Sequence, residues 1–299
     1  MSRFLTLFKI SRPRFWLYLA GPWMVGWFLG LPHDGVRTLG AQYLVPLTFW
    51  RGFLFFLLPA NFFLYGINDF FDGDTDALNQ KKADKEHLLL DSERHFMRWT
   101  LLGSLILSVI YYLTLQGGVA RLLFVIWFAL SFFYSAPPLR FKARPFLDSA
   151  SNVLYALPGM LAFYQTVHCL PPLWVWVAAW LWTAAMHLFS AVPDIEADQK
   201  AGLRTMATVL EYRWSLALCS ALWLNVAWLV GRYGALTLVG TNDYSALRIL
   251  VAILVWVYPA LPLLPLLNPK WDVDRVYWWF PWINGAVGCG LFWWGVLAR

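Results

Sequence analysis

The stretch Asn-Asp-Phe-Phe-Asp-Gly-Asp-Thr-Asp, residues 68–76, places four aspartates within eight residues at the end of a long apolar run. If this run continues as a helix, Asp69, Asp72 and Asp76 stand at positions i, i+3 and i+7 and share one face. Carboxylates gathered on one face repel one another unless cations lie between them. The stretch therefore predicts a cation site, in a chain where only 13% of the residues are charged.

The composition around this stretch is that of a polytopic membrane protein. Of the 299 residues, 60% are hydrophobic, and the mean hydropathy is +0.55, far from the mix of an ordinary soluble domain. The formal net charge is +6, but the lysines and arginines gather in a few loops, which argues against a nucleic-acid partner. The three cysteines have no metal-site spacing, and we interpret them as packing residues.

Nine segments reach the about 20 mostly apolar residues that a membrane-spanning helix needs. We therefore predict an all-α integral membrane protein with nine transmembrane helices in a lipid bilayer, which we place in the inner membrane of the cell. Most of the 23 lysines and arginines precede the first span or follow even-numbered spans. By the positive-inside rule that side is cytoplasmic, and residues 68–76 lie on it. The predicted spans are 14–31, 51–71, 97–116, 119–136, 148–168, 172–193, 214–234, 246–267 and 276–297.

A second acidic cluster follows the sixth predicted span. Asp194 and Asp198 are one helical turn apart, share a face, and leave the membrane on the same predicted side as the first cluster. A single cluster of this kind is also explained as a solvated helix end. Two clusters facing each other favour divalent cations, and Mg²⁺ commonly bridges protein carboxylates to substrate phosphates. The pair therefore indicates a substrate that carries a diphosphate.

Cationic side chains accompany both clusters. The loop after the fourth predicted span is stiffened by prolines and carries Lys142 and Arg144, and the second cluster is followed by Lys200 and Arg204. These residues also serve as topology determinants in a membrane protein. We expect all four to neutralise a bound diphosphate, because fixed cations stabilise such an anion.

The rest of the substrate must suit an apolar bundle, and a prenyl diphosphate meets both requirements. Loss of its diphosphate yields an allylic cation, which aromatic faces stabilise by about 2 kcal/mol each when they are desolvated. A water-poor pocket protects the cation from hydrolysis. Phe70, Tyr134 and Tyr155 are candidates for this role by position, and plain packing is the alternative for each.

These patterns resemble the UbiA superfamily of intramembrane prenyltransferases. The resemblance covers nearly the whole chain, and the paired aspartate motifs are its most specific part. The matching segments are Asn68-Asp69-x-x-Asp72-x-x-x-Asp76, Tyr134-Ser135-x-Pro137-Pro138 with Lys142, Asp194-x-x-x-Asp198, and Ser11-Arg12-Pro13 before the first helix.

The resemblance implies one domain, residues 1–299, with a central cavity inside nine helices. It implies Mg²⁺-dependent transfer of a prenyl group from its diphosphate to a lipophilic acceptor. The catalytic candidates are Asp69, which would support the metal ligands or orient Lys142, Tyr134, and Lys142 itself. The implied metal ligands are Asn68, Asp72, Asp76, Asp194 and Asp198, and the implied diphosphate ligands are Lys142 and Arg144.

The acceptor is less sharply indicated. Residues 11–22 and the form Asp194-Ile-Glu-Ala-Asp198 look most similar to the lycopene elongase branch, which adds five-carbon units to the ends of a carotenoid. The resulting tertiary cation would lose a proton or capture water. His187, on the span that leads to Asp194, could take that proton, or it could be a hydrogen-bonded core residue. Two alternatives are prenylation of an aromatic or quinone precursor and, in another class, a cation transporter.

Overall fold

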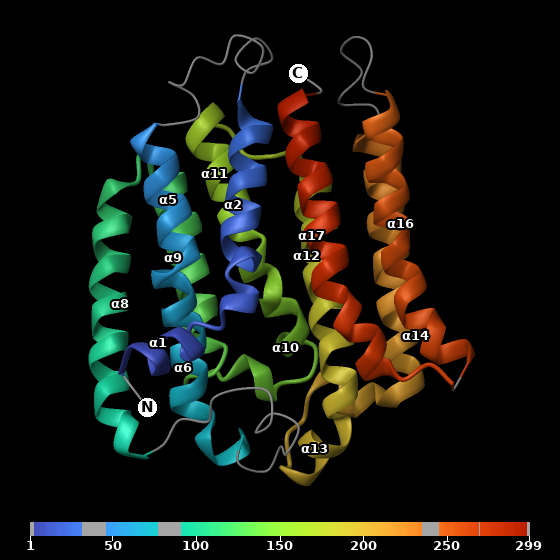
Figure 1. Ribbon diagram of the computed structural model, residues 1–299, viewed down its shortest axis with the longest axis horizontal. Coiled ribbons are helices and arrows are strands. Elements are labelled where there is room, and N and C mark those ends of the chain that lie inside the picture. Colours follow the sequence, from blue (N-terminus) through green and yellow to red (C-terminus); the bar gives the residue numbers. More distant parts are fainter. Residues whose placement is uncertain (1–2, 32–45, 77–90, 235–244, 269, 298–299) are drawn as a thin grey trace.

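The computed structural model describes residues 3–31, 46–76, 91–234, 245–268 and 270–297. Within these ranges the chain is helical and contains no β-strand, which confirms the all-α prediction. The long helices run side by side in one bundle (Figure 1). Three short helices lie at its lower end in that view, namely α1 (Arg3–Ile10), α10 (Leu147–Ala150) and α13 (Ile195–Lys200).

Helices occupy the positions of the predicted spans. Among the described residues, four stretches are long and apolar enough to cross a membrane: Leu47–Phe71, Arg94–Thr114, Leu173–Lys200 and Met206–Tyr233. The other predicted spans coincide with helices that do not meet both criteria there, and the number of nine spans stays a prediction. In chain order the long helices are α2 (Leu17–Gly30), α5 (Leu47–Leu57), α6 (Pro59–Asp76), α8 (Arg94–Thr114), α9 (Gly118–Phe133), α11 (Leu157–Val167), α12 (Leu173–Ala191), α14 (Met206–Leu229), α16 (Ser245–Leu267) and α17 (Val273–Leu297).

The second predicted span, one apolar run in the sequence, is broken into α5 and α6. Proline has no backbone N–H and restricts the residue before it, and Leu58, which precedes Pro59, leaves the helical conformation with φ −121° and ψ −67°. The side-chain amide of Asn61 donates to the carbonyls of Phe56 and Leu57, at 2.8 and 3.0 Å, and so satisfies acceptors at the break. The first aspartate stretch is thereby carried on a helix of its own.

Glycines allow a close contact between two helices, α2 and α11. α2 packs along α11, and a Cβ added to Gly26 would collide with the carbonyl of Gly159. A Cβ on Gly159 would in turn lie 2.8 Å from the carbonyl oxygen of Pro22. Small residues of this kind let membrane helices approach closely. The approach fixes α11, and the segment before it, against α2.

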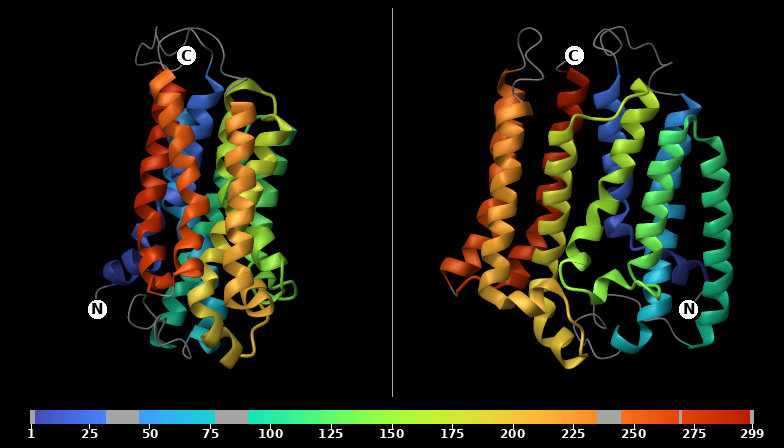
Figure 2. Two further views of the ribbon diagram at one scale, coloured as in Figure 1. Left: turned by 90° about the vertical axis from the view of Figure 1, so that its right-hand side faces the viewer. Right: turned by 180° about the vertical axis from the view of Figure 1, so that it is seen from behind.

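Two buried apolar clusters divide the bundle. One lies between Leu19 and Ala162 in the chain and the other between Ala178 and Val287. In the views of Figure 2, α14, α16 and α17 stand on one side of the bundle and α5, α8 and α9 on the other. Tyr155 packs against both clusters. The boundary between the two halves is where the polar site is found.

Candidate functional site

The first aspartate motif ends α6. Asn68 is half-buried, and Asp69 is only 6% exposed. The backbone of residues 72–76 forms the last turns of α6, as the argument for a shared face requires. The side chains of Asp72 and Asp76, predicted as metal ligands, lie outside the described residues, and their role stays a prediction.

Asp69 forms an ion pair with a residue 57 positions earlier. A guanidinium nitrogen of Arg12 donates to Oδ1 of Asp69 at 2.7 Å. The same guanidinium lies 4.8 Å from the ring centroid of Tyr65. Charge-assisted hydrogen bonds of this length are among the stronger ones in proteins. The pair connects the segment before α2 to the first motif, a partnership that the sequence analysis did not anticipate.

A second hydrogen bond fixes the loop after α9 to the first motif. The buried Ser135 donates from Oγ to Oδ1 of Asn68 at 2.8 Å. The backbone N–H of Lys142 donates to the carbonyl of Tyr134 at 3.0 Å, which closes the loop on itself. The segment from Tyr134 to Lys142 therefore meets the end of α6.

The second motif begins where α12 ends. Val192–Asp194 forms a 3₁₀ turn with a proline near its start, and Asp194 is the residue before α13. Asp198 lies within α13, one turn further on, as the spacing predicted. Both side chains are half-buried. The two motifs reach the same end of the bundle, where α6 and α13 lie close to the lower edge in Figure 1.

A cavity of about 270 Å³ brings these elements together. Both motifs contribute to it, through Asn68 on one side and through Asp194 and Asp198 on the other. Since α6 runs toward the motif end of the bundle, Leu64 and Tyr65 line the cavity deeper in the bundle than Asn68. The remaining lining residues are Arg12, Tyr134, Lys142, Asn152, Leu154, Tyr155, His187, Ser190, Ala191, Ala197, Ala201, Leu203 and Thr205.

The predicted diphosphate ligands separate into two groups. Lys142 is half-buried and lines the cavity. Arg144 is exposed, and its guanidinium donates to the carbonyl of Pro138 at 3.2 Å. Lys200 and Arg204 are also exposed, and neither they nor Arg144 line the cavity. The role of these four residues in binding diphosphate stays a prediction. Of the four, Lys142 is the one that lines the cavity.

The three aromatic candidates also divide into residues that line the cavity and one that does not. Tyr134 and Tyr155 line the cavity. Phe70 contacts Phe71, and the guanidinium of Arg98 lies 6.0 Å from its ring, so its ring faces α8 and not the cavity. Tyr134 and Tyr155 are therefore the predicted aromatic residues in a position to meet a cation formed there.

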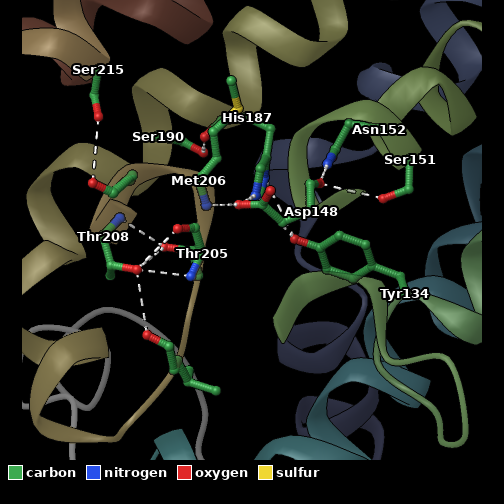
Figure 3. A network of polar contacts seen from close by, with 12 residues as sticks. Tyr134, Asp148, Ser151, Asn152, His187, Ser190, Thr205, Met206, Thr208 and Ser215 are labelled. Atoms are coloured by element: carbon green, nitrogen blue, oxygen red, sulfur yellow. Dashed lines mark hydrogen bonds and ion pairs between the residues drawn. The ribbon is translucent and has the colours of Figure 1, made fainter. Parts of the chain in front are cut away.

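A polar network continues from the cavity into the bundle (Figure 3). The hydroxyl of Tyr134 lies 3.4 and 3.5 Å from the two ring nitrogens of His187. The same Nε2 of His187 is 3.9 Å from Oδ2 of Asp148. Asp148 is fully buried and accepts the backbone N–H of Met206 at 2.7 Å. Asp148 is a functional candidate that the sequence analysis missed.

The donor set of the cavity fits a magnesium ion. Among the side chains that the structure describes, no three carboxylate, histidine or cysteine groups lie together as a metal site. The cavity is lined by Asn68, Asp194 and Asp198, whose side chains carry amide and carboxylate oxygens. These are hard oxygen ligands of the kind that Mg²⁺ prefers, and so small a set leaves coordination positions for phosphate oxygens and water.

Comparison with known families agrees with this arrangement of motifs. The UbiA prenyltransferase family matches residues 35–296, most of the chain. The chain belongs to this family. It is a membrane prenyltransferase, and the cation transporter considered from the sequence is not supported.

Individual relatives extend the comparison. A lycopene elongase/hydratase from Haloarcula japonica is 40% identical over 283 residues, covering 94% of this chain and 88% of the relative. A protein of the same name from Halobacterium salinarum is 38% identical, covering 94% of both chains. A solved UbiA homologue from Archaeoglobus fulgidus, bound to DMAPP and Mg²⁺, has a TM-score of 0.73 at 20% identity and covers 98% of both chains. At that identity, the solved structure shows that the fold is shared.

Proposed function

We propose that this UbiA family protein transfers a dimethylallyl group from its diphosphate to an end of a carotenoid such as lycopene, with Mg²⁺ as its cofactor. We further propose that it spans the membrane nine times, with both aspartate motifs on the cytoplasmic side. One observation carries the proposal: Asn68 of the first motif and Asp194 and Asp198 of the second line one cavity together with Lys142.

In this proposal the polar end of the cavity binds the diphosphate. Asn68, Asp194 and Asp198 would hold Mg²⁺, together with Asp72 and Asp76 from the last turns of α6. When bound, Mg²⁺ would supply positive charge to the leaving diphosphate. Lys142 and Arg12 line the same cavity and add positive charge from the chain itself. Arg144, Lys200 and Arg204 attract the anionic substrate from the surface.

The inner part of the cavity receives the hydrocarbon. Leu64 and Leu154 supply an apolar wall, and the rings of Tyr134 and Tyr155 face the allylic cation that remains when the diphosphate leaves. Exclusion of water lets the acceptor, and not solvent, react with this cation. The terminal double bond of the acceptor then forms the new carbon–carbon bond and becomes a tertiary cation.

The choice of a carotenoid acceptor rests on the relatives and agrees with the cavity. The curated relatives at 38–40% identity are named lycopene elongase/hydratase. Among the described lining residues, the lysine and arginine side chains are Lys142 and Arg12, and we assign both to the diphosphate. A hydrocarbon acceptor needs no charged anchor, whereas an aromatic acid acceptor would need one.

The test is prenyl transfer in membranes that contain the protein. Lycopene and dimethylallyl diphosphate are added with Mg²⁺. The carotenoids are then separated, and their masses are measured by mass spectrometry. We expect products one and two five-carbon units heavier than lycopene, and no product when the metal is chelated. Product from an aromatic acid, with none from lycopene, would replace the carotenoid acceptor by an aromatic one within the same fold.

A further inference from the structure

His187 is placed to touch a substrate. It lines the cavity, and its side chain is 17% exposed. Its Cα precedes that of Asp194 by seven residues along α12 and the turn that follows, which at helical rise is on the order of 10 Å toward the interior of the bundle. His187 therefore lines the cavity deeper than Asp194, where the hydrocarbon ends of two substrates would meet beyond the diphosphate.

Asp148 is buried next to Nε2 of His187 and does not line the cavity. Its side chain is 0% exposed. Its Oδ2 is held by the Met206 N–H at 2.7 Å, and the hydroxyl of Ser151 donates to its backbone carbonyl at 3.3 Å. Among the described residues, its Oδ1 has no hydrogen-bond partner. In its ionised form, a carboxylate buried in this way favours a positive charge on a neighbouring group.

We propose that His187 is the catalytic base that ends the reaction, and that Asp148 is a positioning residue that stabilises the protonated imidazole. This inference rests on the proposed function. The tertiary cation left on the acceptor has two exits. In one, a C–H bond beside the cationic carbon breaks, its electron pair forms a double bond, and the proton moves to the unprotonated ring nitrogen of His187. In the other, a water oxygen bonds to the cation, and one of that water's protons moves to the same nitrogen.

The other polar residues of the cavity are less suited to this step. Asp194 and Asp198 are assigned to the metal, and the ammonium of Lys142 has no lone pair to accept a proton. The hydroxyl of Tyr134 lies 3.4 Å from Nε2 of His187, where it can orient the ring or a water molecule for the second exit. Among the described lining residues His187 is the one neutral nitrogen base. The geometry thus places one base where it can accept the proton released in either exit, to an alkene or to an alcohol.

The experiment compares His187→Gln and Asp148→Asn with the wild type in the lycopene assay. Both variants keep the size of the side chain, and Asp148→Asn keeps an oxygen to accept the Met206 N–H. We expect His187→Gln to lower kcat for elongated carotenoid about 100-fold, with an unchanged KM for dimethylallyl diphosphate and a changed ratio of alkene to alcohol. Asp148→Asn should change kcat and the ratio of alkene to alcohol in the same direction as His187→Gln, but by a smaller amount.

The matched control is His95→Gln, because His95 is exposed at the start of α8 and bonds to Trp99. It should leave rate and ratio unchanged. If the wild type elongates lycopene but His187→Gln, folded and inserted, keeps a rate within about threefold and the same product ratio, His187 is a packing residue and the inference is wrong. If His187→Gln does not fold, the product ratio of Asp148→Asn decides in the same way. A wild type that leaves lycopene unchanged overturns the proposed acceptor instead.

Discussion

The guanidinium of Arg12 lies 2.7 Å from the carboxylate of Asp69, and this contact joins the first residues of the chain to the first aspartate motif. The side chains are 14% and 6% exposed, respectively. An anion so deeply buried depends on its cation, since removal of one partner from a buried pair typically costs about 3–5 kcal/mol. Arg12 also lines the cavity, so it can influence both stability and binding.

Replacement of Arg12 should therefore destabilise the protein. We expect Arg12→Ala to lower the thermal unfolding temperature clearly, and Arg12→Lys to lower it less, because lysine keeps the charge but loses the planar fork of the guanidinium. Arg14→Ala is the control: Arg14 is exposed and lies 4.0 Å from the ring centroid of Trp278, a contact worth about 0.5–1 kcal/mol. Equal unfolding temperatures for Arg12→Ala and Arg14→Ala in the same detergent would contradict the importance of the pair.

The two cations of the loop after α9 should differ in their effect on activity. Lys142 lines the cavity, whereas Arg144 is exposed and bonds to the carbonyl of Pro138. Lys142→Ala should reduce kcat/KM for the prenyl diphosphate by about 10²-fold, because a fixed cation in a water-poor site is worth several kcal/mol to a developing anion. Arg144→Ala should reduce it by no more than about threefold, the effect of a screened surface charge. Steady-state rates over a range of diphosphate concentrations distinguish the two, and a larger loss in Arg144→Ala would reverse our ranking.

The glycine contact between α2 and α11 should be intolerant of a methyl group. A Cβ at position 26 meets the backbone of Gly159, which cannot rotate away as a side chain can. We expect Gly26→Ala to destabilise the protein by about 1–3 kcal/mol through overpacking. Gly103→Ala on α8 is the matched control, because a Cβ there has nothing within 4 Å and alanine favours helix. In thermal unfolding, Gly26→Ala should lower the unfolding temperature, whereas Gly103→Ala should raise it or leave it unchanged.

The helices could be predicted from the sequence because they follow local patterns, and the shared end of the two motifs followed from the order of the predicted spans. Apolar runs located the helices, and the i, i+4 spacing placed Asp194 and Asp198 on adjacent turns. The break at Leu58 was missed because the apolar run is continuous through Pro59, although the proline was a usable signal. The face-sharing argument for Asp72 and Asp76 concerns side chains outside the described residues.

Contacts between distant residues could not be predicted in this way. Arg12 and Asp69 are 57 positions apart, and Met206 and Asp148 are 58 apart, so no local spacing joins them. Asp148 sits at the start of a predicted apolar span, where a single acid resembles a helix-end residue. In the fold, α10, α12 and α14 pack against one another, and this packing brings Asp148 close to His187 and Met206. Conversely, Lys200 and Arg204 looked like diphosphate ligands because they follow Asp198 in the chain, yet they do not line the cavity.

The central claim is that both aspartate motifs hold one prenyl diphosphate through Mg²⁺. Its most direct test is magnesium-dependent release of pyrophosphate from dimethylallyl diphosphate in the presence of lycopene, measured for the wild type, Asp72→Ala and Asp194→Ala. We predict that release by the wild type requires Mg²⁺ and that each variant loses it by about 10³-fold or more, while remaining folded and inserted. Pyrophosphate release near the wild-type rate in either variant would contradict the claim.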